Sequence, residues 1–210
     1  MTETTTAQQF WDTFYDDRDS AAGKPNALLV REVASLTPGT ALDLGCAEGA
    51  DALWLAELGW QVTAADVSAT ALRRAETHAA AKGLTGRIDW QRHDLARSFP
   101  AGVFDLVSAQ FLHSPVAASG ERENILARAA KAVAPGGLLL VVGHAGWPSW
   151  LREPPADVHL PTTAEVLGSL DLEPGRWQVE LEELLERELT GPEGESGVRK
   201  DNVLRIRRAR

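Results

Sequence analysis

Residues 41–49 read ALDLGCAEG, and this stretch decides the fold. Its apolar positions 41, 42 and 44 form a short run that Gly45 closes, which is typical of a buried strand. The following residues 48–60, EGADALWLAELGW, repeat apolar side chains at helical spacing until Gly59 ends the pattern. The stretch therefore predicts a strand, a tight turn and a helix.

The same alternation continues along the chain. Four further strands are expected at 60–66, 87–94, 104–110 and 138–144. Further helices are expected at 25–36, 68–82 and 121–134. Strands that alternate with helices of this length imply right-handed crossovers and a parallel sheet covered on both faces. The sequence predicts a doubly wound α/β fold.

The last third of the chain breaks this alternation. Residues 162–165 form a capping box that opens a short helix. Segments 177–189 and 198–207 are joined by GPEGESG, which favours an antiparallel hairpin. The leucines at 181, 184, 185 and 189 also fit one face of a helix, and only the hairpin loop favours the strand. With the hairpin, the sheet has seven strands and is mainly parallel.

One domain is expected for the 210 residues. We divide it into an N-terminal cap segment (1–25), a ligand-binding core (26–144), a loop rich in proline and tryptophan on the substrate side (145–161), and a helix with the terminal hairpin (162–210). No second domain and no internal repeat is evident.

Composition and charge exclude several classes of function. The chain has 21 basic and 30 acidic side chains, a net charge of −9, so nucleic acids and membrane surfaces are poor partners. Its single cysteine, Cys46, excludes an internal disulfide and a multi-thiolate site, and the five histidines show no metal-ligand spacing. The N-terminus resembles no signal peptide, and we expect a cytoplasmic protein. The oligomeric state is left open.

Three acids close successive predicted strands: Asp43, Asp66 and Asp94. In an open parallel sheet, the ligand binds at the carboxyl ends of the strands. The turn after Asp43 lacks the G-x-G-x-x-G spacing of a dinucleotide site, and a carboxylate there opposes a pyrophosphate. These features argue against a nicotinamide-dependent oxidoreductase and favour a cationic ligand. Asp66 is placed to accept both hydroxyls of a ribose, and Asp94 to accept from an adenine amine.

In this order and at these spacings, ALDLGCAEG, AADVS, RHDL, FDLVSAQFLH and APGGLLLVV resemble the class I S-adenosylmethionine-dependent methyltransferases. The resemblance covers residues 26–144 and implies a Rossmann-like fold, with S-adenosylmethionine as cofactor and S-adenosylhomocysteine as product. The opening FWDTFYDDRD and the KPN at 24–26 resemble the small-molecule branch of thiopurine-methyltransferase-like and tellurite-resistance-like enzymes.

The resemblance also assigns residues to the cofactor. It places Asp43, Gly45, Ala47 and Gly49 around the methionine part, Asp66 and Val67 at the ribose and adenine, Asp94 and Leu95 at the adenine edge, and Ala109 and Gln110 near the methionine ammonium. Many relatives have glycine where this chain has Ala47. Alanine is a minor change there if its φ is negative.

The resemblance implies methyl transfer by in-line displacement to a small-molecule nucleophile, such as a thiol or another soft acceptor. A thiolate needs no strong base, whereas oxygen or nitrogen nucleophiles need one. His113 and His144 are the candidates for a base or for orienting the substrate. The identity of the acceptor is not indicated.

Aromatic side chains are the candidates for substrate contact. Phe10, Trp11 and Tyr15 either close the site against water or pack on the sheet edge. Trp147 and Trp150 either contact the substrate or anchor their loop. A cofactor-binding protein without turnover, a sensor or a partner subunit, is the alternative function.

Overall fold

A mixed sheet forms the centre of the molecule. The computed structural model describes residues 6–153, 155 and 158–210, and within these ranges the sheet has seven strands in the order β3-β2-β1-β4-β5-β7-β6. Their bounds are β1 Thr40–Leu44, β2 Gln61–Asp66, β3 Ile88–Arg92, β4 Phe104–Gln110, β5 Val133–His144, β6 Trp177–Thr190 and β7 Ser196–Arg208. The first five are parallel, and β7 is antiparallel to both β5 and β6. The predicted fold class is confirmed.

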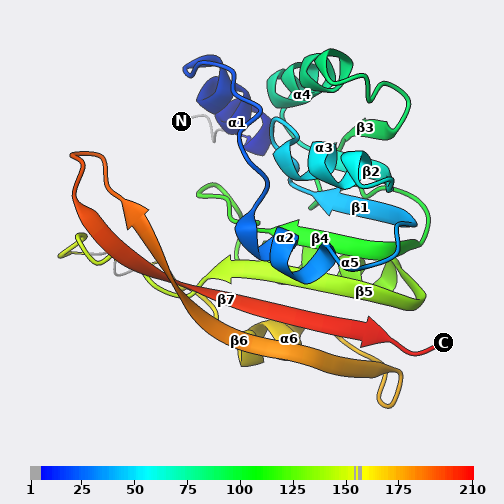
Figure 1. Ribbon diagram of the computed structural model, residues 1–210. Helices are drawn as coiled ribbons and strands as arrows, with labels where there is room; N and C mark the ends of the chain where they lie inside the picture. Colours follow the sequence, from blue (N-terminus) through cyan, green and yellow to red (C-terminus); the bar gives the residue numbers. More distant parts are fainter. Residues whose placement is uncertain (1–5, 154, 156–157) are drawn as a thin grey trace.

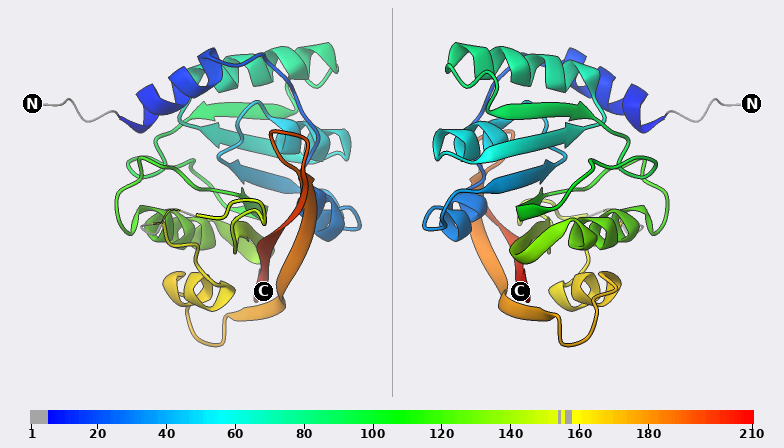
Figure 2. Two further views of the ribbon diagram at one scale, coloured as in Figure 1. Left: turned by 90° about the vertical axis from the view of Figure 1, so that its left-hand side faces the viewer. Right: turned by 90° about the vertical axis from the view of Figure 1, so that its right-hand side faces the viewer.

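Helices cover both faces of the sheet. Their bounds are α1 Ala7–Asp16, α2 Ala27–Val33, α3 Ala50–Glu57, α4 Ala69–Ala81, α5 Glu121–Lys131 and α6 Thr163–Ser169. The helices α2, α3 and α4 pack on one face, and α5 and α6 pack on the other (Figures 1 and 2). The helix α1 lies beside α4, near the edge where the parallel strands end (Figure 1).

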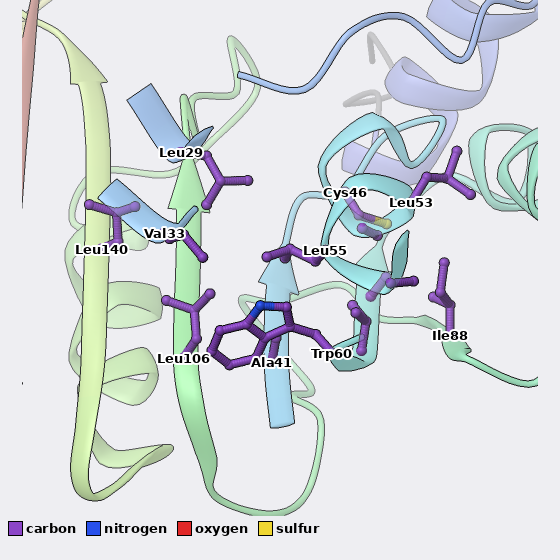
Figure 3. Close-up of a cluster of buried hydrophobic side chains, with 14 of the residues drawn as sticks. Leu29, Val33, Ala41, Cys46, Leu53, Leu55, Trp60, Ile88, Leu106 and Leu140 are labelled. Carbon is purple, nitrogen blue, oxygen red and sulfur yellow. The ribbon is translucent and has the colours of Figure 1, made fainter. Parts of the chain in front are cut away.

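The two-residue period of β1 divides the core between the two faces. Ala41 belongs to the cluster under α2 and α3, whereas Leu42 and Leu44 belong to the cluster under α5. Trp60 is 2% exposed and lies among the first cluster with Cys46 (Figure 3). Asp43 is buried because the residues next to it in β1 belong to the core on both faces of the sheet.

The hairpin resolves the ambiguity that periodicity leaves at residues 177–189. This segment is a strand, because β7 pairs with it over its whole length, from Trp177 with Arg208 to Thr190 with Ser196. In Figure 1 the turn of this hairpin extends past the edge where the parallel strands end.

One expected helix end is wrong. The helix expected over 121–134 ends at Lys131, and Val133 starts β5 by pairing with Phe104. Pro135 disfavours a helical conformation at Ala134, so the chain has already left the helix.

The segment expected as an N-terminal cap contains the helix α1. Its signal is the capping box from Thr6 to Gln9, in which each side chain bonds the other residue's backbone N–H.

Candidate cofactor and substrate site

A cavity of about 490 Å³ opens at the carboxyl ends of the parallel strands. It is lined by the turn after β1, the ends of β2 and β4, the loops after β3 and β4, the start of α5, and the N-terminal segment that includes α1. Because the order of the strands reverses between β1 and β4, this is the position at which an open α/β sheet binds its ligand.

The turn after β1 is held close to β2. The backbone N–H groups of Gly45 and Cys46 both donate to the carbonyl oxygen of Ala65, at 2.8 and 3.1 Å. Gly49 has φ +88°, and a methyl group there would lie 2.6 Å from the Trp90 ring. Glycine is therefore needed at position 49 both for its backbone conformation and for this close approach.

Ala47 adopts a left-handed conformation, with φ +52°. The negative φ that would make alanine a minor change is therefore absent. For a residue other than glycine this conformation costs roughly 1–2 kcal/mol. The turn keeps Ala47 there, since its N–H donates to Asp66 Oδ2 at 2.9 Å.

Asp66 links the two loops that flank the cavity. Its Oδ2 accepts from the Ala47 N–H, and its Oδ1 accepts from the Ser68 N–H, both at 2.9 Å. Burial raises the pKa of this carboxyl, against the lowering effect of those two hydrogen bonds. Carboxylate oxygens have two acceptor positions each, so the bonds to Ala47 and Ser68 leave acceptor capacity for a ligand with two donors.

Two buried acceptors in the cavity lack a donor. Asp43 Oδ2 and Gln110 Oε1 have no hydrogen-bond partner among the described residues, although both side chains line the cavity. Burial, with the negative charges of Asp51 and Asp66 second, raises the pKa of Asp43 well above its ordinary value. A cationic ligand with N–H donors satisfies both atoms, so these residues fit the ammonium group of S-adenosylmethionine.

Carboxylates fasten the N-terminal segment over the cavity. Asp51 accepts from the backbone N–H and from the side-chain amide of Asn26, both at 2.7 Å. Glu48 accepts from the Ser20 hydroxyl at 2.8 Å and from the Ala21 N–H at 2.9 Å, and it pairs with Arg74. Residues 20–26 are thus held against the start of α3 and against α4.

The helix α1 spans the cavity from α4 to the loop after β4. Asp12 Oδ1 accepts from the Ser68 hydroxyl at 2.7 Å, and Trp11 Nε1 donates to Ser114 Oγ at 3.2 Å. Trp11 and Tyr15 line the cavity. Burial, followed by the charge of Asp66, raises the pKa of Tyr15. The helix therefore covers the site with aromatic side chains.

The opposite end of the cavity holds a histidine pair. His113 lines the cavity, and its Nε2 accepts from the backbone N–H of His144 at 3.3 Å. This bond assigns the proton of the neutral ring to Nδ1. Burial, with the positive charge of Arg122 second, lowers the pKa of His113 to about 4. The His144 ring bonds to the buried Asp201, with 2.9 Å between Nδ1 and Oδ1.

The structure brings together most of the residues that sequence reasoning selected. Those lining the cavity are Asp43, Gly45, Ala47, Asp66, Val67, Asp94, Leu95, Gln110, Trp11, Tyr15 and His113. Asp94 is the least buried acid of its group, with a side chain 35% exposed and an ion pair to Arg97.

The other selected residues are not part of the cavity lining: Gly49, Ala109, His144, Phe10, Trp147 and Trp150. Ala109 points into the core under α5, because successive strand residues face opposite sides. The Trp150 ring packs on Gly197 of β7, where a methyl group would lie 2.4 Å from it. The His144 ring bonds to Asp201 and stacks on His113, so it lies behind the lining residue, and its proposed role stays a prediction.

Sequence reasoning missed several lining residues, among them Asn26, Glu48, Asp51, Ser114 and Arg122. Asp51 lies in the first turn of α3, directly after the glycine turn. No local pattern marks Arg122, which reaches the cavity from α5 through the fold.

The described residues contain no group of three histidine, cysteine or acidic side chains arranged to hold a metal ion. In the same part of the chain, no helix has both the length and the apolar character needed to cross a membrane.

Comparisons with known proteins agree with this geometry. Residues 41–137 match the family described as "Methyltransferase domain". The chain is 33% identical over 119 residues to the ribosomal RNA small subunit methyltransferase C of Alcanivorax borkumensis, covering 55% of this chain and 36% of that protein. It is 38% identical over 100 residues to a ubiquinone biosynthesis O-methyltransferase of Caulobacter sp., covering 48% and 38%. The chain thus spans well under half of the length of these curated relatives.

A solved structure described as "Conversion of a Disulfide Bond into a Thioacetal Group during Echinomycin Biosynthesis" superposes with a TM-score of 0.73. Its sequence identity is 23%, over 96% of this chain and 93% of that one. At this identity the likeness concerns the fold. Taken with the match of residues 41–137 to the methyltransferase domain family, it shows that this chain has the class I methyltransferase fold.

Proposed function

We propose that this protein transfers the methyl group of S-adenosylmethionine to a small-molecule nucleophile. The observation that carries the proposal is the pair of unpartnered buried acceptors, Asp43 Oδ2 and Gln110 Oε1, in a cavity at the sheet's switch point. Leaving a buried polar atom unpaired costs about 1–3 kcal/mol, so a ligand that supplies donors recovers this free energy on binding.

In this proposal each acid binds a different part of the cofactor. Asp43 and Gln110 hold the ammonium of the methionine part, Asp66 accepts from the ribose hydroxyls, and Asp94 with Leu95 lies at the adenine edge. The three acids follow neighbouring strands in the order β1, β2 and β3, so the nucleoside extends from the switch point towards the β3 edge. The sulfur end then faces β4 and α5.

When bound, S-adenosylmethionine supplies a methyl group already activated by a positively charged sulfur. The nucleophile's electron pair forms the new bond to the methyl carbon, and the pair of the broken bond stays on sulfur. The protein's part is to align the nucleophile and exclude water, and alignment alone can supply roughly 7–11 kcal/mol. The helix α1 with Trp11 and Tyr15 excludes water.

His113 orients the acceptor rather than acting as a base. Its Nε2 lone pair is occupied by the His144 N–H, and its pKa of about 4 keeps the ring neutral at physiological pH. Because His113 does not act as a base, the site suits a nucleophile that is already anionic, such as a thiolate. The sulfur chemistry named for the echinomycin structure supports a soft acceptor.

A covered cavity of about 490 Å³ supports a small-molecule acceptor, while the ribosomal RNA enzyme among the relatives makes RNA the acceptor to test against. The net charge of −9 also disfavours RNA. Trp147 and Trp150 remain proposed contacts for the part of an acceptor that extends beyond the cavity.

The test has two stages. Isothermal titration with S-adenosylhomocysteine should show one saturable site. Release of S-adenosylhomocysteine from S-adenosylmethionine is then assayed with thiol, phenol, halide and RNA acceptors. We expect turnover with at least one small acceptor and none with RNA. Binding without turnover on any acceptor would instead support a sensor or partner subunit, and absence of binding would refute the proposal.

A further inference from the structure

One end of the cavity carries a cation without a counterion. Arg122, in the first turn of α5, lines the cavity, and its Nε donates to the backbone carbonyl of Leu112 at 3.1 Å. In the part of the chain that the structure describes, no carboxylate lies within ion-pair distance of its guanidinium, and this is its one hydrogen bond. Burial lowers the pKa of Arg122, and the negative charge of Glu123, which forms no ion pair with it among the described residues, opposes this only in part.

The position of the guanidinium is defined by β5. A methyl group added at Gly143 would lie 3.2 Å from Arg122 Nη2 and 3.7 Å from His113 Nε2. Arg122 and His113 therefore converge on one backbone position, and Gly143 leaves room for both. This position lies on the β5 side of β4, away from the acids that follow β1, β2 and β3.

The charges around this end are mostly positive. Arg199 and Arg122 both lie close enough to act on His113, and Asp201 is the acid that acts in the opposite direction. Asp201 is already bonded to His144 and to Arg187, at 2.9 and 2.7 Å. Glu121 also lines the cavity, but its Oε2 accepts from the Ala118 N–H at 3.0 Å and caps its own turn.

We propose that Arg122 binds an anionic group of the methyl acceptor, so that the substrates of this site are small anions rather than neutral molecules. The inference rests on the proposed function. A guanidinium binds a carboxylate through two parallel N–H donors, and both terminal nitrogens of Arg122 remain available for such a pair. His113 is the neighbouring group that orients the acceptor.

The test compares two acceptor probes that differ by one carboxylate charge, 3-mercaptobenzoate and 3-mercaptobenzamide, in which an uncharged amide replaces the carboxylate. Binding to protein saturated with S-adenosylhomocysteine is measured by titration for the wild type, Arg122→Gln and Arg122→Lys. We expect the wild type to bind the carboxylate at least tenfold more tightly than the amide. Arg122→Gln should lose this preference without weakening the amide, and Arg122→Lys should keep part of it because the charge remains.

The matched control is Arg73→Gln, the same change at an exposed position of α4 outside the cavity lining. It should keep the full charge preference. Raising the salt concentration should weaken binding of the carboxylate probe more than binding of the amide probe.

Three results would overturn the inference. One is equal binding of the two probes by the wild type, or no saturable binding of the carboxylate. Another is an equal loss for both probes in Arg122→Gln. The third is a loss of S-adenosylhomocysteine affinity in Arg122→Gln as large as the loss of affinity for the carboxylate probe. This result would assign Arg122 to the cofactor's own carboxylate. Failure of S-adenosylhomocysteine to bind the wild type contradicts the proposed function first, before any acceptor probe is added.

Discussion

The two ends of the cavity bury ionisable groups of opposite kinds, acids at one end and bases at the other. At the ends of β1 and β2, burial raises the pKa of Asp43, Asp51 and Asp66. At the ends of β4 and β5, burial lowers the pKa of His113 and Arg122. In both places the protein holds ionisable groups in surroundings that disfavour their charged forms.

This difference is consistent with the proposal that one cavity binds both the cationic cofactor and an anionic acceptor, although the chain has a net charge of −9. A buried charge without a partner lowers stability, and a ligand of opposite charge removes that cost when it binds. The acidic end fits a cation, and the basic end fits an anion. Each end then selects a ligand group by its charge, because binding of that group recovers the free energy that the unpartnered side chain costs the empty protein.

The largest expected effect is on the acidic end. Asp43→Asn should weaken S-adenosylmethionine binding by about ten- to a hundredfold, because a hydrogen bond to a charged group contributes about 1.5–3 kcal/mol. The same change should stabilise the empty protein at neutral pH, because it removes the cost of burying or protonating this carboxyl. Titration calorimetry and thermal unfolding measure the two effects.

The pH dependence of this stability has a definite sign. Folding raises the pKa of Asp43 above its ordinary 3.8, so the folded state keeps its proton longer than the unfolded chain. The contribution of Asp43 to the free energy of unfolding should therefore fall as pH rises from about 4 towards the raised pKa, whereas the contribution of His113, whose pKa is lowered to about 4, rises between about 4 and its ordinary value. Asp43→Asn should reduce this fall and leave the part due to Asp51 and Asp66. Identical pH profiles for the two proteins would contradict the placement of Asp43.

A smaller effect is expected at Asp66, because loss of its side chain leaves Asp43 in place. Asp66→Ala should weaken S-adenosylmethionine binding about tenfold, since it removes the ribose contacts and the bonds to Ala47 and Ser68. Unchanged affinity would count against the site.

The matched control for Asp66→Ala is Asp105→Ala. Asp105 Oδ2 also accepts two bonds, from the N–H and hydroxyl of Thr40, but at the opposite end of the strands. This variant should lower stability and leave cofactor affinity within about twofold. A similar loss of affinity in both variants would indicate a general effect of destabilisation.

The smallest effect concerns the cover over both ends. Trp11→Phe and Ser114→Ala should each increase the dissociation rate of S-adenosylhomocysteine two- to tenfold, because the bond between them contributes about 0.5–1.5 kcal/mol. The double variant should dissociate no faster than either single one. Additive effects in this cycle would show that the two side chains act independently.

Much of the fold could be predicted because its elements are locally encoded. The apolar run of β5, the glycine turn after β1 and the N-cap at Ser68 all lie within short segments. The errors lie where sequence signals compete. Ala129 and Val133 share a helical spacing, but Pro135 and the pairing with Phe104 make Val133 the start of a strand.

Some residues of the candidate site could likewise be predicted from the sequence, and others could not. Asp43, Asp66 and Asp94 follow strands, so strand order alone brings them to one edge. No comparable rule predicts where the tryptophans of a loop point. The Trp150 ring packs on β7 and does not line the cavity. The left-handed conformation of Ala47 also depends on Asp66, nineteen residues away.

The sequence by itself determined the strand and helix pattern, the acids at the strand ends and hence the kind of cofactor, because periodicity and turn chemistry act over a few residues. Only the tertiary structure decided which acceptors stay unpartnered, which histidine lines the cavity and that Arg122 faces it. Those properties depend on burial and on neighbours brought from distant parts of the chain, as when the backbone of His144 occupies the ring nitrogen of His113.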